Sequence, residues 1–89
     1  MLRYRVAFYL PNTPGGMVVA EALDFPGAMT QGFDLADARV MIASALEDMA
    51  QLNIEEGKPL PVPNPDSAAP DADLIELIPL SVHAGTPRS

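Results

Sequence analysis

Apolar and polar residues alternate in two stretches near the start of the chain. Residues 2–10 place large apolar side chains on one face of an extended segment, namely Tyr4, Val6, Phe8 and Leu10. Residues 17–23 alternate in the same way, and small alanines on one of their faces indicate that another element packs closely there. A period of two predicts β-strands. Residues 11–16, Pro-Asn-Thr-Pro-Gly-Gly, favour a hairpin loop between them.

The period changes from two to three and four after Asp34. The apolar stripe consists of Leu35, Ala38, Ile42, Ala45, Leu46, Met49 and Leu52. This spacing predicts one long α-helix. Asp34 can cap its first turn, and the acidic Asp37 suits the positive end of the helix dipole. Gly57 fits the left-handed position after the last turn and Pro59 cannot continue a helix, so we expect the helix to end at Glu55 or Glu56.

A turn and a short strand connect the second strand to the helix. Pro26 and Gly27 break the extended pattern, because proline fixes its own φ and restricts the residue before it. Residues 28–31, ending at Gln31, read as a third strand. Gly32 then allows a sharp turn into the Asp34 cap. The three strands should form an antiparallel meander that leads into the helix.

The region after the helix is rich in proline. Residues 57–72 contain Pro59, Pro61, Pro63, Pro65 and Pro70, a composition typical of a semi-rigid extended connection. Residues 73–82 return to a strand pattern, in which Pro79 indicates an edge position. We expect one domain over residues 1–83 and a disordered tail over residues 84–89.

The resulting order is β-β-β-α-β. A strand that follows a helical crossover lies most simply parallel to a strand already in the sheet. The sequence therefore predicts a two-layer α+β domain with a four-stranded mixed sheet and one helix.

Charge and length restrict the possible partners. Twelve acidic and five basic residues give a net charge of −7, which repels phosphate backbones and attracts basic partners, so we expect no direct binding of nucleic acid. The sequence shows neither a secretory leader nor a membrane-spanning run, which predicts a cytoplasmic protein. A chain of 89 residues buries only roughly 60 to 65% of its unfolded surface, which favours a homo-oligomer, either a dimer or a tetramer.

Nothing in the sequence forms a catalytic or metal-binding pattern. The chain has no cysteine, and His83 is its single histidine, so a metal site is not expected. The pairs Glu47–Asp48 and Glu55–Glu56 are adjacent in sequence and point apart on a helix, which is typical of a solvated face. We predict no enzyme activity and no cofactor.

Two motifs resemble the HicB-type antitoxin family. They are Ala-Glu-Ala-Leu-Asp-Phe-Pro-Gly-Ala-Met-Thr-Gln-Gly at residues 20–32 and Leu-Ala-Asp-Ala at residues 35–38. The start of the chain, residues 4–6, and Gly-Lys-Pro-Leu-Pro at 57–61 also fit. The resemblance implies a partial ribonuclease-H-like fold without nuclease activity. It also implies a small, basic ribonuclease toxin, HicA, as the partner whose active site is covered. Many members carry an additional DNA-binding segment; the chain ends at Ser89 without one, and operator binding is not expected.

The residues that would contact a basic toxin should combine charge with apolar surface. We predict that Glu21, Asp24 and an exposed Phe25 do so around the turn, with Glu76 on the last strand as a further candidate. Pro26, Gly27, Gln31, Gly32 and Asp34 are expected to shape the turn and the helix cap. A different hypothesis is a homo-oligomeric domain of the same fold that has no toxin and binds a small ligand or only itself.

Overall fold

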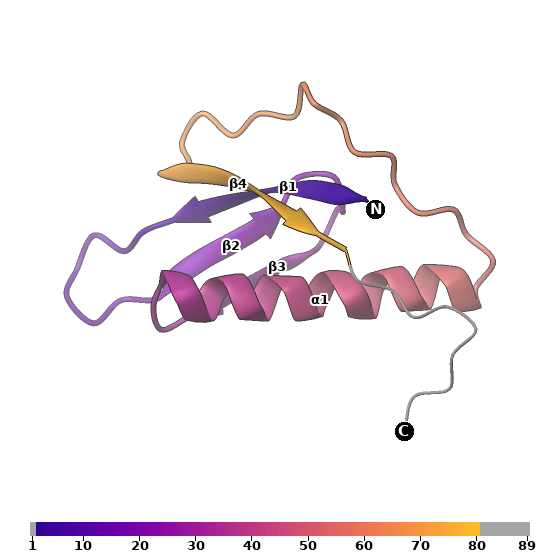
Figure 1. The fold of residues 1–89 in the computed structure, drawn as a ribbon. Coiled ribbons are helices and arrows are strands. Elements are labelled where there is room, and N and C mark those ends of the chain that lie inside the picture. Colours follow the sequence, from indigo (N-terminus) through magenta and orange to yellow (C-terminus); the bar gives the residue numbers. More distant parts are fainter. Residues whose placement is uncertain (1, 81–89) are drawn as a thin grey trace.

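The computed structural model describes residues 2–80 and shows a sheet with one helix packed along it (Figure 1). Its elements are β1 (Arg3–Tyr9), β2 (Val18–Ala22), β3 (Met29–Gly32), α1 (Leu35–Glu55) and β4 (Leu74–Pro79). The predicted α+β class, the two layers and the order of elements are confirmed. The end of the predicted last strand at Val82 and the predicted tail over residues 84–89 lie outside the described residues.

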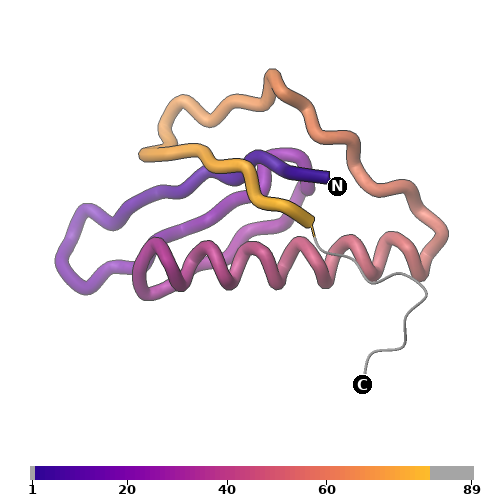
Figure 2. The backbone as a smooth tube through the Cα atoms, viewed as in Figure 1, coloured from indigo at the N-terminus to yellow at the C-terminus, as the bar shows by residue number. Residues whose placement is uncertain are grey.

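The sheet has the order β3-β2-β1-β4, and every neighbouring pair is antiparallel. The prediction of a mixed sheet is therefore wrong. A helix of 21 residues covers about 31 Å and brings the chain to the far end of the sheet. Residues 57–73 then return to the opposite end of the sheet without a further helix or strand (Figure 2). An extended segment of that length can span roughly 50 Å, which is enough for this return. β4 consequently starts beside the beginning of α1 and runs antiparallel to β1.

The start of α1 is capped by two side chains that act reciprocally. The Oδ1 atom of Asp34 accepts a hydrogen bond from the Asp37 amide at 2.7 Å, and Oδ2 of Asp37 accepts one from the Phe33 amide at 2.8 Å. The pattern resembles a capping box, except that the Asp37 carboxylate accepts from the amide of Phe33, the residue before the N-cap Asp34. At the other end Gly57 has a φ of 72°, as its predicted role requires. Both predicted ends of the helix are confirmed.

One face of the sheet packs against α1 and forms the core. The buried side chains on this face come from alternate strand positions: Tyr4, Val6, Phe8, Val18, Ala20 and Ala22. Ala38, Ile42, Leu46 and Ala50 cover them from the helix. Gly32 is essential here, because a Cβ at this position would overlap the backbone of Ala38. The predicted close packing over the small residues of β2 is confirmed.

Candidate partner-binding surfaces

Phe25 does not lie on the surface. Its side chain is 2% exposed and packs edge-on against the Tyr4 ring, with centroids 5.0 Å apart. The expectation of an exposed Phe25 is therefore wrong. The reason is the tight turn after β2, in which the Ala28 amide donates to the Phe25 carbonyl and folds the ring back over the sheet. Pro26 and Gly27 form the exposed tip of this turn, where Gly27 adopts a φ of 88°.

Asp24 holds the proline-rich connection against the sheet. Its Oδ1 atom accepts hydrogen bonds from the Asn64 amide at 3.2 Å and from the Ser67 hydroxyl at 2.9 Å. The Tyr4 hydroxyl donates to the Pro61 carbonyl at 2.6 Å and fixes the same segment further upstream. Burial raises the pKa of Tyr4, and the Asp24 carboxylate adds to this. These contacts give Asp24 a structural role in addition to the predicted one.

Glu21 and Glu76 lie on opposite faces of the sheet. Glu21 accepts a hydrogen bond from the Tyr9 hydroxyl at 3.0 Å on the face that α1 does not cover, which we call the open face. Glu76 is on the helix side, where Arg39 donates to both of its carboxylate oxygens at 2.8 and 2.6 Å. The bonds from Arg39 hold the pKa of Glu76 below its usual value. The four predicted contact residues therefore do not converge on one patch.

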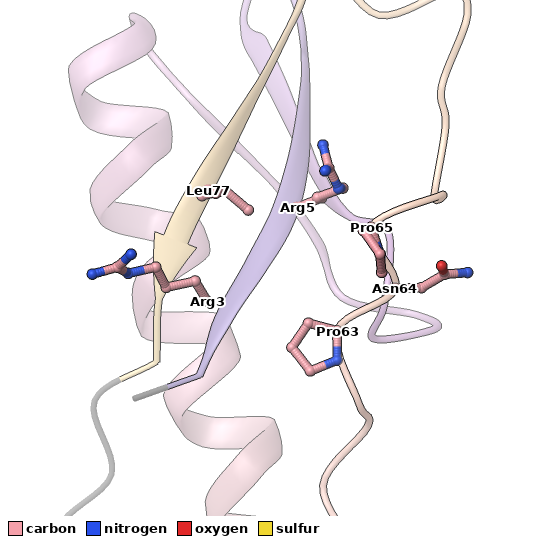
Figure 3. Close-up of a pocket in the computed structure, with 6 residues that line it drawn as sticks. All are labelled: Arg3, Arg5, Pro63, Asn64, Pro65 and Leu77. Carbon is pink, nitrogen blue, oxygen red and sulfur yellow. The ribbon is translucent and has the colours of Figure 1, made fainter.

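The open face carries two arginines beside the connection. Arg3, Arg5 and Leu77 line a depression of about 250 Å³ together with Pro63, Asn64 and Pro65 (Figure 3). Among the described residues neither arginine forms an ion pair, whereas Arg39 and Lys58 do. The two guanidinium groups point away from each other in Figure 3. The two guanidinium groups are therefore not placed to bind one anion together.

The outward face of α1 combines acidic and apolar side chains, and none of its residues is among the toxin contacts predicted from the sequence. Its carboxylates are Asp37, Glu47, Asp48 and Glu55. Two large apolar side chains accompany them, Val40 at 67% exposure and Phe33, just before the helix, at 81%. The single basic residue of the helix, Arg39, is neutralised by Glu76. The position of Val40 outside the buried stripe is the sequence signal that marks this face.

Within residues 2–80, no group of three or more potential metal ligands comes together. In the same part of the chain, no helix has the length and apolar content needed to cross a membrane.

Solved structures that are similar to this chain include two of an antitoxin and one of a toxin-antitoxin complex. The crystal structure of the N-terminal domain of Burkholderia pseudomallei antitoxin HicB has a TM-score of 0.71 at 16% identity, covering 90% of this chain and 99% of that one. The longer structure of Burkholderia pseudomallei antitoxin HicB has a TM-score of 0.77 at 17% identity, covering 100% and 73%. A toxin-antitoxin complex from Streptococcus pneumoniae has a TM-score of 0.73 at 18% identity, covering 99% and 77%. No family model and no curated protein matches the sequence. The chain therefore shares the fold of the HicB antitoxin structures.

Proposed function

We propose that this protein is an antitoxin of the HicB type that binds a small, basic ribonuclease toxin and covers its active site. The observation that carries the proposal is the likeness of nearly the whole fold to HicB antitoxins and to a chain of a toxin-antitoxin complex. The net charge of −7 supports it, because a strongly acidic chain attracts a basic partner over long distances. HicA is the proposed toxin class, and the cytoplasm is the proposed site of action.

The outward face of α1 is the surface that best fits such a toxin. Its carboxylates would steer a basic protein, and the exposed Phe33 and Val40 can supply the desolvated contacts that hold a complex together. Phe25 cannot supply them without leaving the core, and Asp24 is occupied by Asn64 and Ser67. Glu21 stays a predicted contact on the open face.

The protein is proposed to act by binding and to have no nuclease activity of its own. Hydrolysis of RNA by metal ions needs carboxylates that converge on the ions. The two carboxylates on the strands of the sheet, Glu21 on β2 and Glu76 on the edge strand β4, project from opposite faces. Incubation with RNA and Mg²⁺ or Mn²⁺ tests this directly, and cleavage that survives repurification and is lost on chelation would contradict it.

The test of function uses the reading frame next to the gene. Its product should be a small basic protein that arrests growth and cleaves RNA, and this chain should suppress both effects. Absence of such a product, or failure of the folded chain to suppress it, would contradict the proposal and leave the homo-oligomeric domain without a toxin as the alternative.

Charge reversal separates the candidate surfaces. Glu47→Lys with Asp48→Lys should weaken toxin binding roughly tenfold or more, since it inverts charge on the outward face of α1. The matched control is Glu21→Lys with Asp71→Lys, which makes the same change of charge elsewhere. Stronger loss of binding in the control would place the toxin on the open face, as the sequence predicted for Glu21.

A further inference from the structure

The outer edge of β3 differs from the surrounding surface in having no charge. Residues 25–33 contain no charged side chain, although the chain as a whole has 19% charged residues. β3 stands at one end of the sheet, and within residues 2–80 its only strand partner is β2. Charged residues and prolines are the usual means of blocking such an edge, and β3 has neither.

The hydrogen-bonding pattern shows which backbone groups of β3 are free. The Ala22 amide donates to the Ala28 carbonyl, which fixes the alternation of bonded and non-bonded pairs along β2 and β3. Thr30 and Gly32 therefore bond to β2. The amide and carbonyl groups of Met29 and Gln31 point away from β2, toward the open edge.

The opposite edge of the sheet is protected. The Leu80 amide donates to the Leu2 carbonyl, so Tyr4 and Ile78 form a bonded pair and Arg3 and Pro79 a non-bonded one. Pro79 therefore occupies an outward position on β4, where it removes a donor from the edge. The helix-facing side of β4 also carries Glu76 in its ion pair with Arg39. β3 has no equivalent of either device.

Apolar side chains lie on both sides of the β3 edge. Met29 is 59% exposed on the open face and lines a groove of about 310 Å³ with Val19, Thr30 and Gln31. Arg39 faces β4, so the opposite flank of α1 overhangs β3. By helical spacing this flank carries Met41 and Leu52, both exposed.

We infer that the β3 edge is a self-association site at which a second copy of this chain adds its own β3 in antiparallel orientation. The free groups of Met29 and Gln31 set the register, with Met29 of one copy opposite Gln31 of the other and Thr30 next to the two-fold axis. Each such pair exchanges two hydrogen bonds. The two sheets become one continuous sheet, and the Met41 and Leu52 flanks of the two helices meet on the same side of it. The inference does not rest on the proposed function.

The absence of charge at the β3 edge favours a second copy of this chain over a basic partner. Two chains of charge −7 repel each other, and they can approach most easily through a surface without charge. A basic toxin would instead favour the acidic outward face of α1. Since salt screens repulsion between like charges, self-association should strengthen as salt is added, whereas binding to a basic protein should weaken.

Sedimentation equilibrium of the full chain tests the inference with a matched pair of variants. Gln31→Pro removes an outward amide and leaves the bonds to β2 in place, so it copies onto β3 the role of Pro79 on β4. It should raise the dimer dissociation constant by roughly 30-fold or more, because each dimer loses two hydrogen bonds. Gln31→Ala keeps the amide and should leave the dissociation constant within about threefold of the wild type. A wild-type chain that remains monomeric at high micromolar concentration would overturn the inference, as would a folded Gln31→Pro that still forms the dimer.

Hydrogen exchange of the wild-type chain provides a test that does not depend on the folding of a variant. The amides of Met29 and Gln31 should become protected as the protein concentration rises, and more so at high salt, while the Thr30 amide is protected throughout. Fast exchange of the Met29 and Gln31 amides in the dimer would place the interface elsewhere. Protection that arises only when a basic protein is added would assign the edge to a different partner and equally overturn the inference.

Discussion

The two faces of the sheet are built from the same strands but differ in how closely they are packed. The face under α1 is closed, and Gly32 and the alanines of β2 let the helix backbone approach the sheet. The open face mixes arginine, tyrosine, glutamate and exposed apolar side chains such as Met29 and Leu77. Stability should therefore depend on the closed face, while substitutions on the open face should have little effect on folding and can serve recognition.

The largest difference in the free energy of unfolding is expected between alanine substitutions at Phe25 and at Met29. Phe25→Ala should lower the free energy of unfolding by about 3 to 5 kcal/mol, because it leaves a cavity beside Tyr4. Met29→Ala on the open face should change it by less than about 0.5 kcal/mol, since this side chain is mostly solvated. Urea unfolding at a concentration where the chain is monomeric measures both. Similar losses in the two variants would remove the distinction between the faces.

Gly32→Ala should have the next largest effect. The added Cβ would meet the backbone of Ala38, which cannot move without shifting the first turn of α1. We expect a loss of about 1 to 3 kcal/mol in the free energy of unfolding, as is typical of overpacking. Thermal unfolding followed by circular dichroism is sufficient, and an unchanged midpoint would show that the helix can slide on the sheet.

Tyr4→Phe tests how the proline-rich connection after α1 is held against the sheet. The substitution keeps the packing against Phe25 but removes the hydrogen bond to the Pro61 carbonyl, which should cost about 1 kcal/mol. The pKa of Tyr4 is raised above its ordinary value of 10.0 in the folded chain, so the fold favours the protonated phenol. Stability from this group is complete below pH 10.0 and is lost as the pH rises through the folded pKa. The alkaline loss should be smaller in Tyr4→Phe.

The smallest effect is expected at the ion pair between Arg39 and Glu76, because both side chains are partly exposed and solvent screens their attraction. Glu76→Gln should destabilise the fold less than Tyr4→Phe does. Because the pKa of Glu76 is lowered from 4.5, its contribution is present above that pH and is lost as the pH falls through the folded pKa. A stability profile of wild type and variant between pH 7 and pH 3 should therefore converge on the acid side. Profiles that stay parallel would show that the pair does not contribute.

Local patterns in the sequence were enough to place the elements, because caps and periodicities act over a few residues. Asp34 and Gly57 mark the helix ends as expected, and Pro79 is at an edge. The direction of β4 was not predictable in this way, since it depends on the path of residues 57–73 around the sheet. The same limit applies to the candidate site. The sequence indicates a turn at Asp-Phe-Pro-Gly, residues 24–27. Only packing against Tyr4 decides that the Phe25 side chain faces inward.

The position of β1 has a consequence for the order of folding. β1 lies between β2, which follows it after a short hairpin, and β4, which is synthesised after the other three strands and the helix. Pairing β1 with β4 closes a long loop, so this step is slower than formation of the meander. During translation, the growing chain must therefore keep one side of its most buried strand unpaired until residues 74–79 leave the ribosome. In that interval, the β4 strand of a completed chain could occupy the vacant side of another, and the length of residues 57–73 makes such an exchange of strands geometrically easy.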